Sequence, residues 1–147
     1  MRAAGDWGLR AAGRWLLAVA CACGAVAPAG AVPPPPPRAE LSVDLLPNGP
    51  EQVLRDTVRA YQPVPVSFAV RAGDRLLLRL EDAERVLVLQ LDAPSGLPWI
   101  SGVVPGPDGI DMGFAQTGVH RLLVLMSADA ARTGRAANFE LGLRLRR

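Results

Sequence analysis

Lysine is absent from this chain of 147 residues, and histidine and cysteine are scarce. All 16 basic side chains are arginines, the single histidine is His120, and the two cysteines are Cys21 and Cys23. A typical zinc site takes several histidine and cysteine ligands, so none can be assembled beyond residue 23. His120 lies within an apolar stretch, and no serine has the Gly-x-Ser-x-Gly context of a nucleophile elbow. We therefore predict a protein that is not an enzyme and that uses neither a metal nor a cofactor.

Residues 1–31 have the pattern of a secretory signal peptide. Trp15–Ala27 is an apolar run too short to cross a bilayer, which needs about 20 apolar residues, and Ala29–Ala31 has the small residues of a cleavage site. The positive region before the apolar run contains Arg2, Arg10 and Arg14. We expect cleavage after Ala31 and a periplasmic or secreted protein that has no stable membrane insertion.

Both cysteines lie inside this signal, so the mature protein would have no disulfide and would depend on packing for its stability. The alternative is a lipoprotein signal, in which residues 17–21 form a degenerate lipobox and Cys21 is lipidated. Only six residues separate Arg14 from Cys21, which is short for the apolar region of such a signal. Mass spectrometry of the secreted form distinguishes the two alternatives.

The mature chain carries no net charge. Three of the 16 arginines and one of the 14 acidic residues belong to the signal, so 13 of each remain after cleavage. A neutral domain argues against nucleic acid and against an anionic membrane as the binding partner.

Residues 32–40 form a proline-rich linker. Residues 32–38 read VPPPPPR, and consecutive prolines hold an extended polyproline II conformation. Binding to a proline-recognition module is one interpretation of this stretch. We favour a stiff spacer between the cleavage site and the folded domain.

From residue 41 onward the pattern is that of β-strands separated by turns. Apolar residues alternate in 66–71, and a turn at Ala72–Asp74 leads into the apolar stretch 75–80, as in a β-hairpin. Two stretches are nearly apolar on both faces, residues 85–91 and 119–126, which is typical of interior strands. Residues 98–104 form a weaker strand. The last strand, residues 138–146, places on its inward face Phe139, Leu141, Leu143 and Leu145.

Three further stretches remain to be assigned. Residues 52–61 suit a short helix as well as a strand, and we assign a strand from the context. Residues 104–113, VPGPDGIDMG, are assigned to a turn-rich connection. The acidic turn Glu81–Glu84 lacks the ordered spacing of a calcium loop and is interpreted as a solvated turn. Strands spaced by roughly 8–12 residues, without a strong long helix, predict an all-β, antiparallel β-sandwich over residues 41–147.

Three motifs follow one another near the end of the chain. They are the start of a long strand at Gly118–His120, an Ala-Ala-Arg loop at Ala130–Arg135 and the final strand at Ala137–Leu141. With the hairpin RAGDRLLLRL upstream, they make residues 58–145 resemble the bacterial pre-peptidase-C-like β-sandwich family, a jelly-roll-like fold. Within it the chain is most similar to the periplasmic inhibitors of g-type lysozyme and their uncharacterised relatives. The chain departs from the family, which prefers tyrosine, tyrosine and an acid, at His120, Phe139 and Arg135.

The resemblance implies that the loop Ala130–Ala137 is the partner-binding element. Arg132 matches the family arginine and is the candidate anchor, because a guanidinium pairs with a carboxylate in a planar, bidentate way. The alternative is that Arg132 bonds to the main-chain carbonyls of its own loop. Gly134 is expected to allow a tight reversal of the backbone. The weaker binding candidates are Thr133, Gly134, Arg135 and Asn138.

Trp99 lies in a Pro/Gly-rich stretch and is interpreted either as an exposed contact residue or as a cap on the end of the sandwich. Tyr61 is ambiguous in the same way. His120 is interpreted as a histidine packed in the sheet. An enzymatic role would need it exposed in a cleft beside a carboxylate and a hydroxyl.

Together these features predict an exported envelope protein with a protein partner, a g-type lysozyme, whose muramidase cleft is occluded by the loop Ala130–Ala137. The alternative is a non-catalytic accessory module of the same fold, which binds carbohydrate or an exported protein. The departures at the three family positions favour the alternative, because they change the surface that would inhibit.

Overall fold

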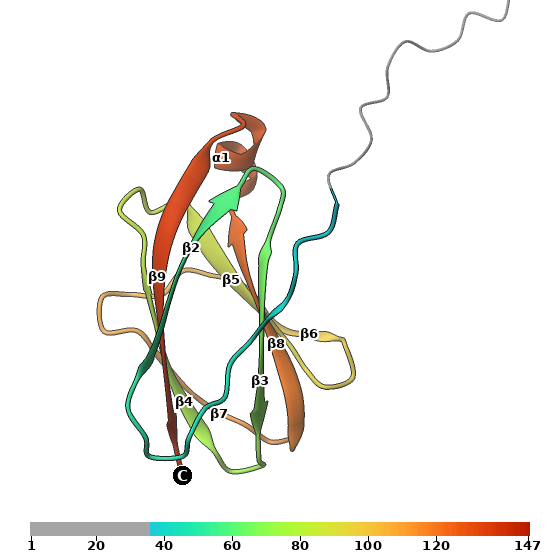
Figure 1. Cartoon of the computed structure of the whole chain (residues 1–147), viewed down its shortest axis with the longest axis vertical. Helices are drawn as coiled ribbons and strands as arrows, with labels where there is room; N and C mark the ends of the chain where they lie inside the picture. The colour runs from blue at the N-terminus through green and yellow to red at the C-terminus, as the bar shows by residue number, and fades with distance from the viewer. Residues whose placement is uncertain (1–35) are drawn as a thin grey trace, which may run out of the picture. The chain divides into compact units, whose positions relative to one another are not determined.

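The computed structural model describes residues 36–147, which form two β-sheets and one short helix (Figure 1). The predicted signal, Cys21 and residues 32–35 of the predicted linker lie outside the described residues. No helix within residues 36–147 is long and apolar enough to cross a membrane. The elements are β1 (Leu41–Ser42), β2 (Gln52–Arg59), β3 (Val64–Val70), β4 (Arg75–Glu81), β5 (Leu87–Asp92), β6 (Pro98–Val103), β7 (Ile110–Gly113), β8 (Gly118–Met126), α1 (Ala128–Arg132) and β9 (Ala136–Arg146).

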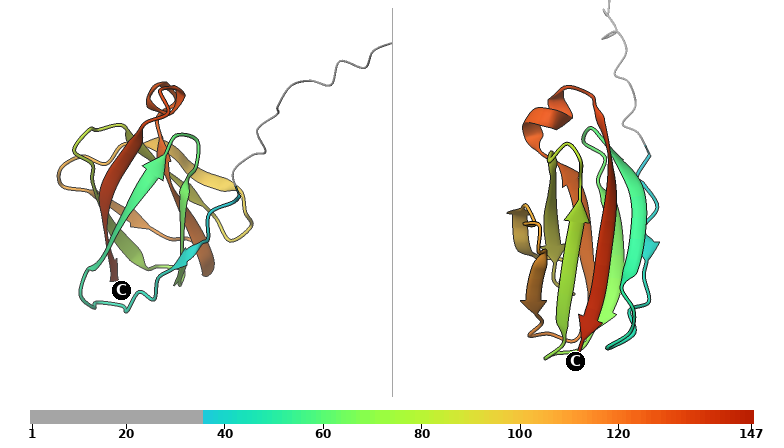
Figure 2. Two further views of the ribbon diagram at one scale, coloured as in Figure 1. Left: turned by 45° about the horizontal axis from the view of Figure 1, so that its top comes forward. Right: turned by 90° about the vertical axis from the view of Figure 1, so that its left-hand side faces the viewer.

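The two sheets pack face to face as the layers of a sandwich (Figure 2). One sheet has the strand order β1-β3-β8-β5-β6, and the other has the order β2-β9-β4-β7. Neighbouring strands are antiparallel except for β1 and β3, which are parallel. The predicted all-β sandwich is confirmed. The assignment of residues 52–61 to a strand is confirmed for residues 52–59, which form β2, whereas residues 60 and 61 lie in a turn.

The hydrophobic core lies between the sheets and follows the alternation of apolar residues along each strand. In β9 the predicted inward set is buried throughout, and in β3 the buried set includes Val66, Phe68 and Val70. Successive side chains of a strand point to opposite faces, so every second apolar residue reaches the core. The predicted inward faces of β3 and β9 are therefore confirmed.

The assignment of residues 104–113 to a connection was wrong for its last four residues. Ile110–Gly113 form β7, which pairs with β4 along Arg75–Leu78. The strand is short and follows Gly109, whose φ of +80° is a conformation that glycine adopts readily. The proline and glycine turn signals beside it masked a strand too short to show clear alternation.

The prediction that β8 is apolar on both faces was also wrong for its first half. Val119 is exposed and Arg121 projects from the same face, where its guanidinium lies 3.8 Å from the carboxylate of Glu40. Leu123 and Leu125 on that outer face are partly buried. The outer face of β8 therefore changes from solvated to apolar along its length.

The first described residues protect strand edges. β1 pairs with β3, and Arg38 donates to the carbonyl oxygen of Thr57 at 2.6 Å and forms an ion pair with Asp56. An uncovered strand edge is a template for pairing with another chain. Arg38, which the sequence places in the linker, thus contacts the edge strand β2.

Candidate functional site

The segment Ser127–Arg135, which we call the tip, joins β8 to β9. It stands at the end of the domain where β2 ends and β9 begins, away from the C-terminus (Figure 1). The prediction of one loop over Ala130–Ala137 was wrong at both ends. Its first three residues belong to α1, and Ala136 already belongs to β9.

Local hydrogen bonds explain why a helical turn forms there. Ala130 and Ala131 are buried, and their small side chains let the turn pack closely against the end of the core. The Thr133 hydroxyl and amide donate to the carbonyl oxygen of Ala130 at 2.6 and 3.1 Å. The Gly134 amide donates to Ala131 at 3.1 Å, and Gly134 has φ +69°, the left-handed conformation that ends many helices. Gly134 therefore reverses the chain as expected.

The tip is fastened to two neighbouring turns. The Ser127 amide donates to the carbonyl oxygen of Val86 at 2.7 Å, and the Ala60 amide donates to that of Arg135 at 3.0 Å. The guanidinium of Arg135 forms an ion pair with Glu84 at 2.5 Å. These contacts reach the β2–β3 turn and the β4–β5 turn. These bonds hold the tip in place against the rest of the domain.

Arg132 projects from the tip into solvent. Its side chain is 71% exposed, and its only ion pair among the described residues is with exposed Asp129, at 3.3 Å. No main-chain carbonyl within residues 36–147 accepts a hydrogen bond from its guanidinium. Of the two interpretations of Arg132, the structure therefore agrees with the first: the guanidinium points outward and does not bond to the main-chain carbonyls of its own loop.

The other candidates of the tip have local partners. Thr133 bonds to Ala130, as described above, and Arg135 is held by Glu84. Asn138 lies within β9, where its side-chain oxygen accepts a hydrogen bond from the Thr57 hydroxyl at 2.6 Å. The structure therefore brings Arg132, Thr133, Gly134 and Arg135 together in the tip and places Asn138 on the adjoining sheet.

Trp99 is not part of this group. Its ring packs against Phe114 and His120, with centroid distances of 5.6 and 6.4 Å. His120 precedes Met126, the last residue before the tip, by six residues of β8. At about 3.4 Å per residue this is roughly 20 Å. Trp99 therefore lies far along the sandwich from Arg132. It covers the aromatic end of the core and is itself 45% exposed.

His120 is buried in that aromatic cluster. Its ring packs edge-on against Phe114 at 4.7 Å and parallel to Phe68 at 6.4 Å between centroids. The Nδ1 atom lies 3.4 Å from the carbonyl oxygen of Gly118. Burial lowers the pKa of His120, because the charged ring would lose its hydration. The exposed catalytic arrangement that an enzymatic role would require is not present at His120.

Replacing His120 by Phe is expected to make the domain less sensitive to mild acid. Below about pH 6.5 the unfolded histidine binds a proton before the folded one, because the folded pKa is lowered. Stability therefore falls from pH 6.5 down to the folded pKa, and this histidine does not affect its pH dependence at higher pH. The melting temperature, measured at pH 8 and pH 5, should drop less in His120→Phe than in the unmodified protein. An equal drop in both proteins would contradict the burial of a neutral ring.

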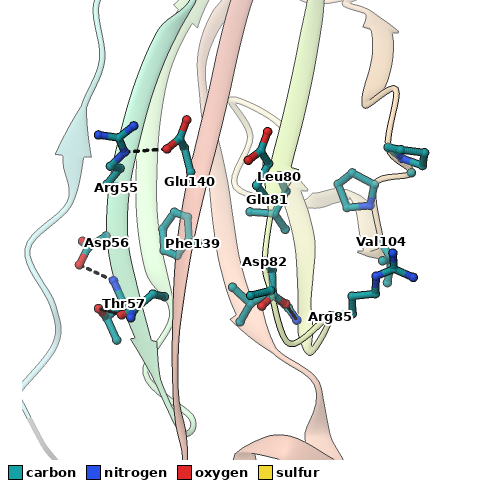
Figure 3. A pocket seen from close by; sticks show the side chains of 16 residues that line it. Arg55, Asp56, Thr57, Leu80, Glu81, Asp82, Arg85, Val104, Phe139 and Glu140 are labelled. Atoms are coloured by element: carbon teal, nitrogen blue, oxygen red, sulfur yellow. Dashed lines mark hydrogen bonds and ion pairs between the residues drawn. The ribbon is translucent and has the colours of Figure 1, made fainter.

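A groove of about 970 Å³ opens on the four-stranded sheet beside the tip (Figure 3). The sheet contributes a polar wall, and the β6–β7 loop, Val104–Pro107, contributes the opposite wall. The β4–β5 turn closes one end of the groove through Asp82, Ala83 and Arg85. Of the residues that line this groove, only Asn138 is a binding candidate that the sequence predicts. The lining residues come from four separate segments, 55–57, 80–87, 104–107 and 138–140, and only strand register brings them together.

No model of a protein family matches the sequence, and the comparison with curated proteins also finds no match. Solved structures do match. PliG of Aeromonas hydrophila, a periplasmic inhibitor of g-type lysozyme, has a TM-score of 0.57 at 15% identity, over 74% of this chain and 100% of its own. A PliG mutant from Escherichia coli has a TM-score of 0.59 at 11% identity, over 73% of this chain and 97% of its own.

The pre-peptidase C-terminal domain of a Bacillus anthracis collagenase also matches. Its TM-score is 0.53 at 14% identity, over 76% of this chain and 98% of the domain. Both kinds of protein are therefore covered almost completely by the residues that form the sandwich. This chain accordingly has the β-sandwich fold of the periplasmic g-type lysozyme inhibitors and of the pre-peptidase C-terminal domain, as its sequence resemblance predicts.

Proposed function

We propose that this chain is a periplasmic or secreted protein without catalytic activity, which inserts its tip into the cleft of a g-type lysozyme. One observation carries the proposal: Arg132 points into solvent from a tip that is bonded to both neighbouring turns. The likeness of the fold to PliG supports the same class of partner.

The order of the tip favours binding. An ordered segment loses less conformational entropy when it binds, so more of the interaction energy contributes to affinity. The tip is fastened through Ser127, Ala60 and Arg135, and its buried alanines leave little room for internal motion. We therefore expect the tip to bind without rearranging.

The charge of the tip suits a glycosidase cleft. Most glycoside hydrolases carry a pair of carboxylates across the scissile bond, and a guanidinium binds a carboxylate with two parallel hydrogen bonds. The present partner of Arg132, Asp129, is exposed, and exposed ion pairs contribute little stability. Arg132 can therefore exchange Asp129 for a carboxylate of the lysozyme at small cost.

Replacing Arg132 by Ala is expected to weaken inhibition of g-type lysozyme tenfold or more, since buried interfacial arginines are frequent hot spots. The measurement is an inhibition titration of purified protein against g-, c- and i-type lysozymes. Arg144→Ala is the matched control, because Arg144 is exposed, forms no ion pair within residues 36–147 and pairs with Leu77 near the other end of β9. Failure to inhibit any of the three classes would refute the proposal, and equal effects of the two substitutions would refute the role of the tip.

An accessory binding module is the second candidate, because a collagenase domain has the same fold. In that case the protein binds a glycan or an exported protein and leaves every lysozyme active. A glycan array together with pull-down of envelope proteins tests it. Glycan binding without lysozyme inhibition would favour this candidate over the first.

A further inference from the structure

Three charged side chains form a row across the outer face of the four-stranded sheet. Glu140 of β9 lies opposite Arg55 of β2 and opposite Glu81 of β4 in the strand register. Arg55 donates to Glu140 at 2.6 Å, as Figure 3 shows. Glu81 is 71% exposed, and its nearest cation, Arg79, is 3.9 Å away. The row therefore runs plus, minus, minus, and like charges directly opposite one another are unfavourable.

Beyond Glu81, the row leads from β4 into the groove. β7 would extend the sheet beyond β4, but it pairs only with Arg75–Leu78. A Cβ on Gly109 would lie 2.5 Å from the carbonyl oxygen of Leu78, so that oxygen faces the β7 edge. Backbone groups alternate between the two edges of a strand, so those of Leu80 face the same edge. No strand of the described domain pairs with Leu80 on that side.

The groove has room for a chain beside Leu80. Its outer wall is the β6–β7 loop, in which Pro105 and Pro107 restrict the backbone and Val104 exposes an apolar side chain. A stiff wall opposite a free strand edge is a preformed slot. Extended peptides add to such edges through main-chain hydrogen bonds, and pockets for alternate side chains then provide specificity.

We propose that the groove binds an extended segment of the protein partner, which adds to the free edge of β4 and places a lysine or arginine opposite Glu81. This inference rests on the proposed function only in taking the partner to be a protein. The groove adjoins the tip, because Glu84 of the β4–β5 turn holds Arg135 while Asp82, Ala83 and Arg85 of the same turn line the groove. One partner can therefore contact both surfaces.

The lining favours a peptide over a glycan. The only aromatic residue in the lining is Phe139, and its ring is buried. The groove therefore presents no exposed ring on which a sugar can stack. The groove does present the free main-chain edge at Leu80, which can bond to the backbone of a peptide, and the carboxylate of Glu81, which can pair with a basic side chain of that peptide.

The test is an NMR titration of the isotopically labelled protein with the peptide Thr-Arg-Thr-Arg-Thr-Arg. A second peptide, with glutamine in place of arginine, removes the charge and keeps the alternation. The proposal predicts shifts centred on the amide of Leu80. It also predicts roughly two- to fivefold weaker binding of the arginine peptide to Glu81→Gln, the loss expected for one cross-strand charge pair. Asp44→Asn, an exposed residue outside the groove, is the matched control and should bind normally.

The outcomes separate this inference from the proposed function. Shifts at Leu80 that depend on Glu81 support the groove even if Arg132→Ala leaves lysozyme inhibition unchanged. Inhibition that depends on Arg132, with no shift at Leu80, supports the tip and overturns the groove. Equal binding of both peptides to Glu81→Gln and the unmodified protein would overturn the charge assignment. Shifts at Leu80 with chitooligosaccharides but with neither peptide would overturn the choice of occupant.

Discussion

Replacing Leu141 by Ala is expected to lower the free energy of unfolding by about 2–5 kcal/mol. Leu141 is 0% exposed and lies in β9 between Leu54 of β2 and Leu80 of β4. Removing the larger part of its side chain loses the burial of that apolar surface and leaves a cavity, because the surrounding strands relax only partially. No cysteine occurs in the described domain, so no disulfide offsets the loss.

Urea denaturation at neutral pH measures this effect. Leu46→Ala is the matched control, because the same atoms are removed from a side chain that is 60% exposed, and it should change the stability by less than about 0.5 kcal/mol. Similar losses for the two substitutions would contradict the inward register of β9. Because β9 begins directly after the tip, a loosened β9 is also expected to weaken any binding that depends on Arg132.

Replacing Asp74 by Ala is expected to cost about 1–3 kcal/mol, because it removes hydrogen bonds to a charged acceptor. The side chain of Asp74 is 1% exposed and accepts a hydrogen bond from the amide of Arg71 at 2.9 Å. It also accepts two from the guanidinium of Arg147, at 2.7 and 2.9 Å. This carboxylate therefore ties the end of the chain to the β3–β4 turn.

The contribution of Asp74 should depend on pH. Hydrogen bonds from Arg147 lower the pKa of Asp74 from 3.8 to about 2. Below about pH 4 the unfolded carboxyl binds a proton while the folded one resists it, so the stabilisation is complete above pH 4 and is lost towards pH 2. The stability gap between the unmodified protein and Asp74→Asn should therefore be larger at pH 7 than at pH 3. Asp44→Asn, which alters an exposed carboxylate, should show no such change. A gap of equal size at both values would contradict the ion pair.

The alternation of apolar and polar residues allowed much of the sandwich to be predicted from the sequence. In β3 and β9 every second residue is apolar, so the period alone predicts which side chains enter the core. β7 was not predicted, because four residues beside glycine and proline are too few to show the two-residue period of a strand. α1 was not predicted for a different reason: a five-residue helix is stabilised by the packing of Ala130 and Ala131, which the sequence does not show.

The candidate site divides in the same way. Arg132 was identified from a local motif, and its neighbours in the chain remain its neighbours in the tip. The groove depends on Arg55, Glu81 and Glu140, which are far apart in the sequence. Only the pairing of β9 with both β2 and β4 aligns them. For Trp99 the residue type alone was misleading. A tryptophan suggests a contact residue, but its position in β6 separates it from the tip.

By itself, the sequence determined the fold class, the inward faces of the long strands and the arginine-bearing segment before the last strand, because each depends on residues close together in the chain. The tertiary structure alone decided that Arg132 faces solvent, that Arg135 is held by Glu84, and that a groove with a free strand edge adjoins the tip. These features arise from contacts between distant segments, and the physical reason is that strand register and packing between sheets select them, which no local pattern encodes.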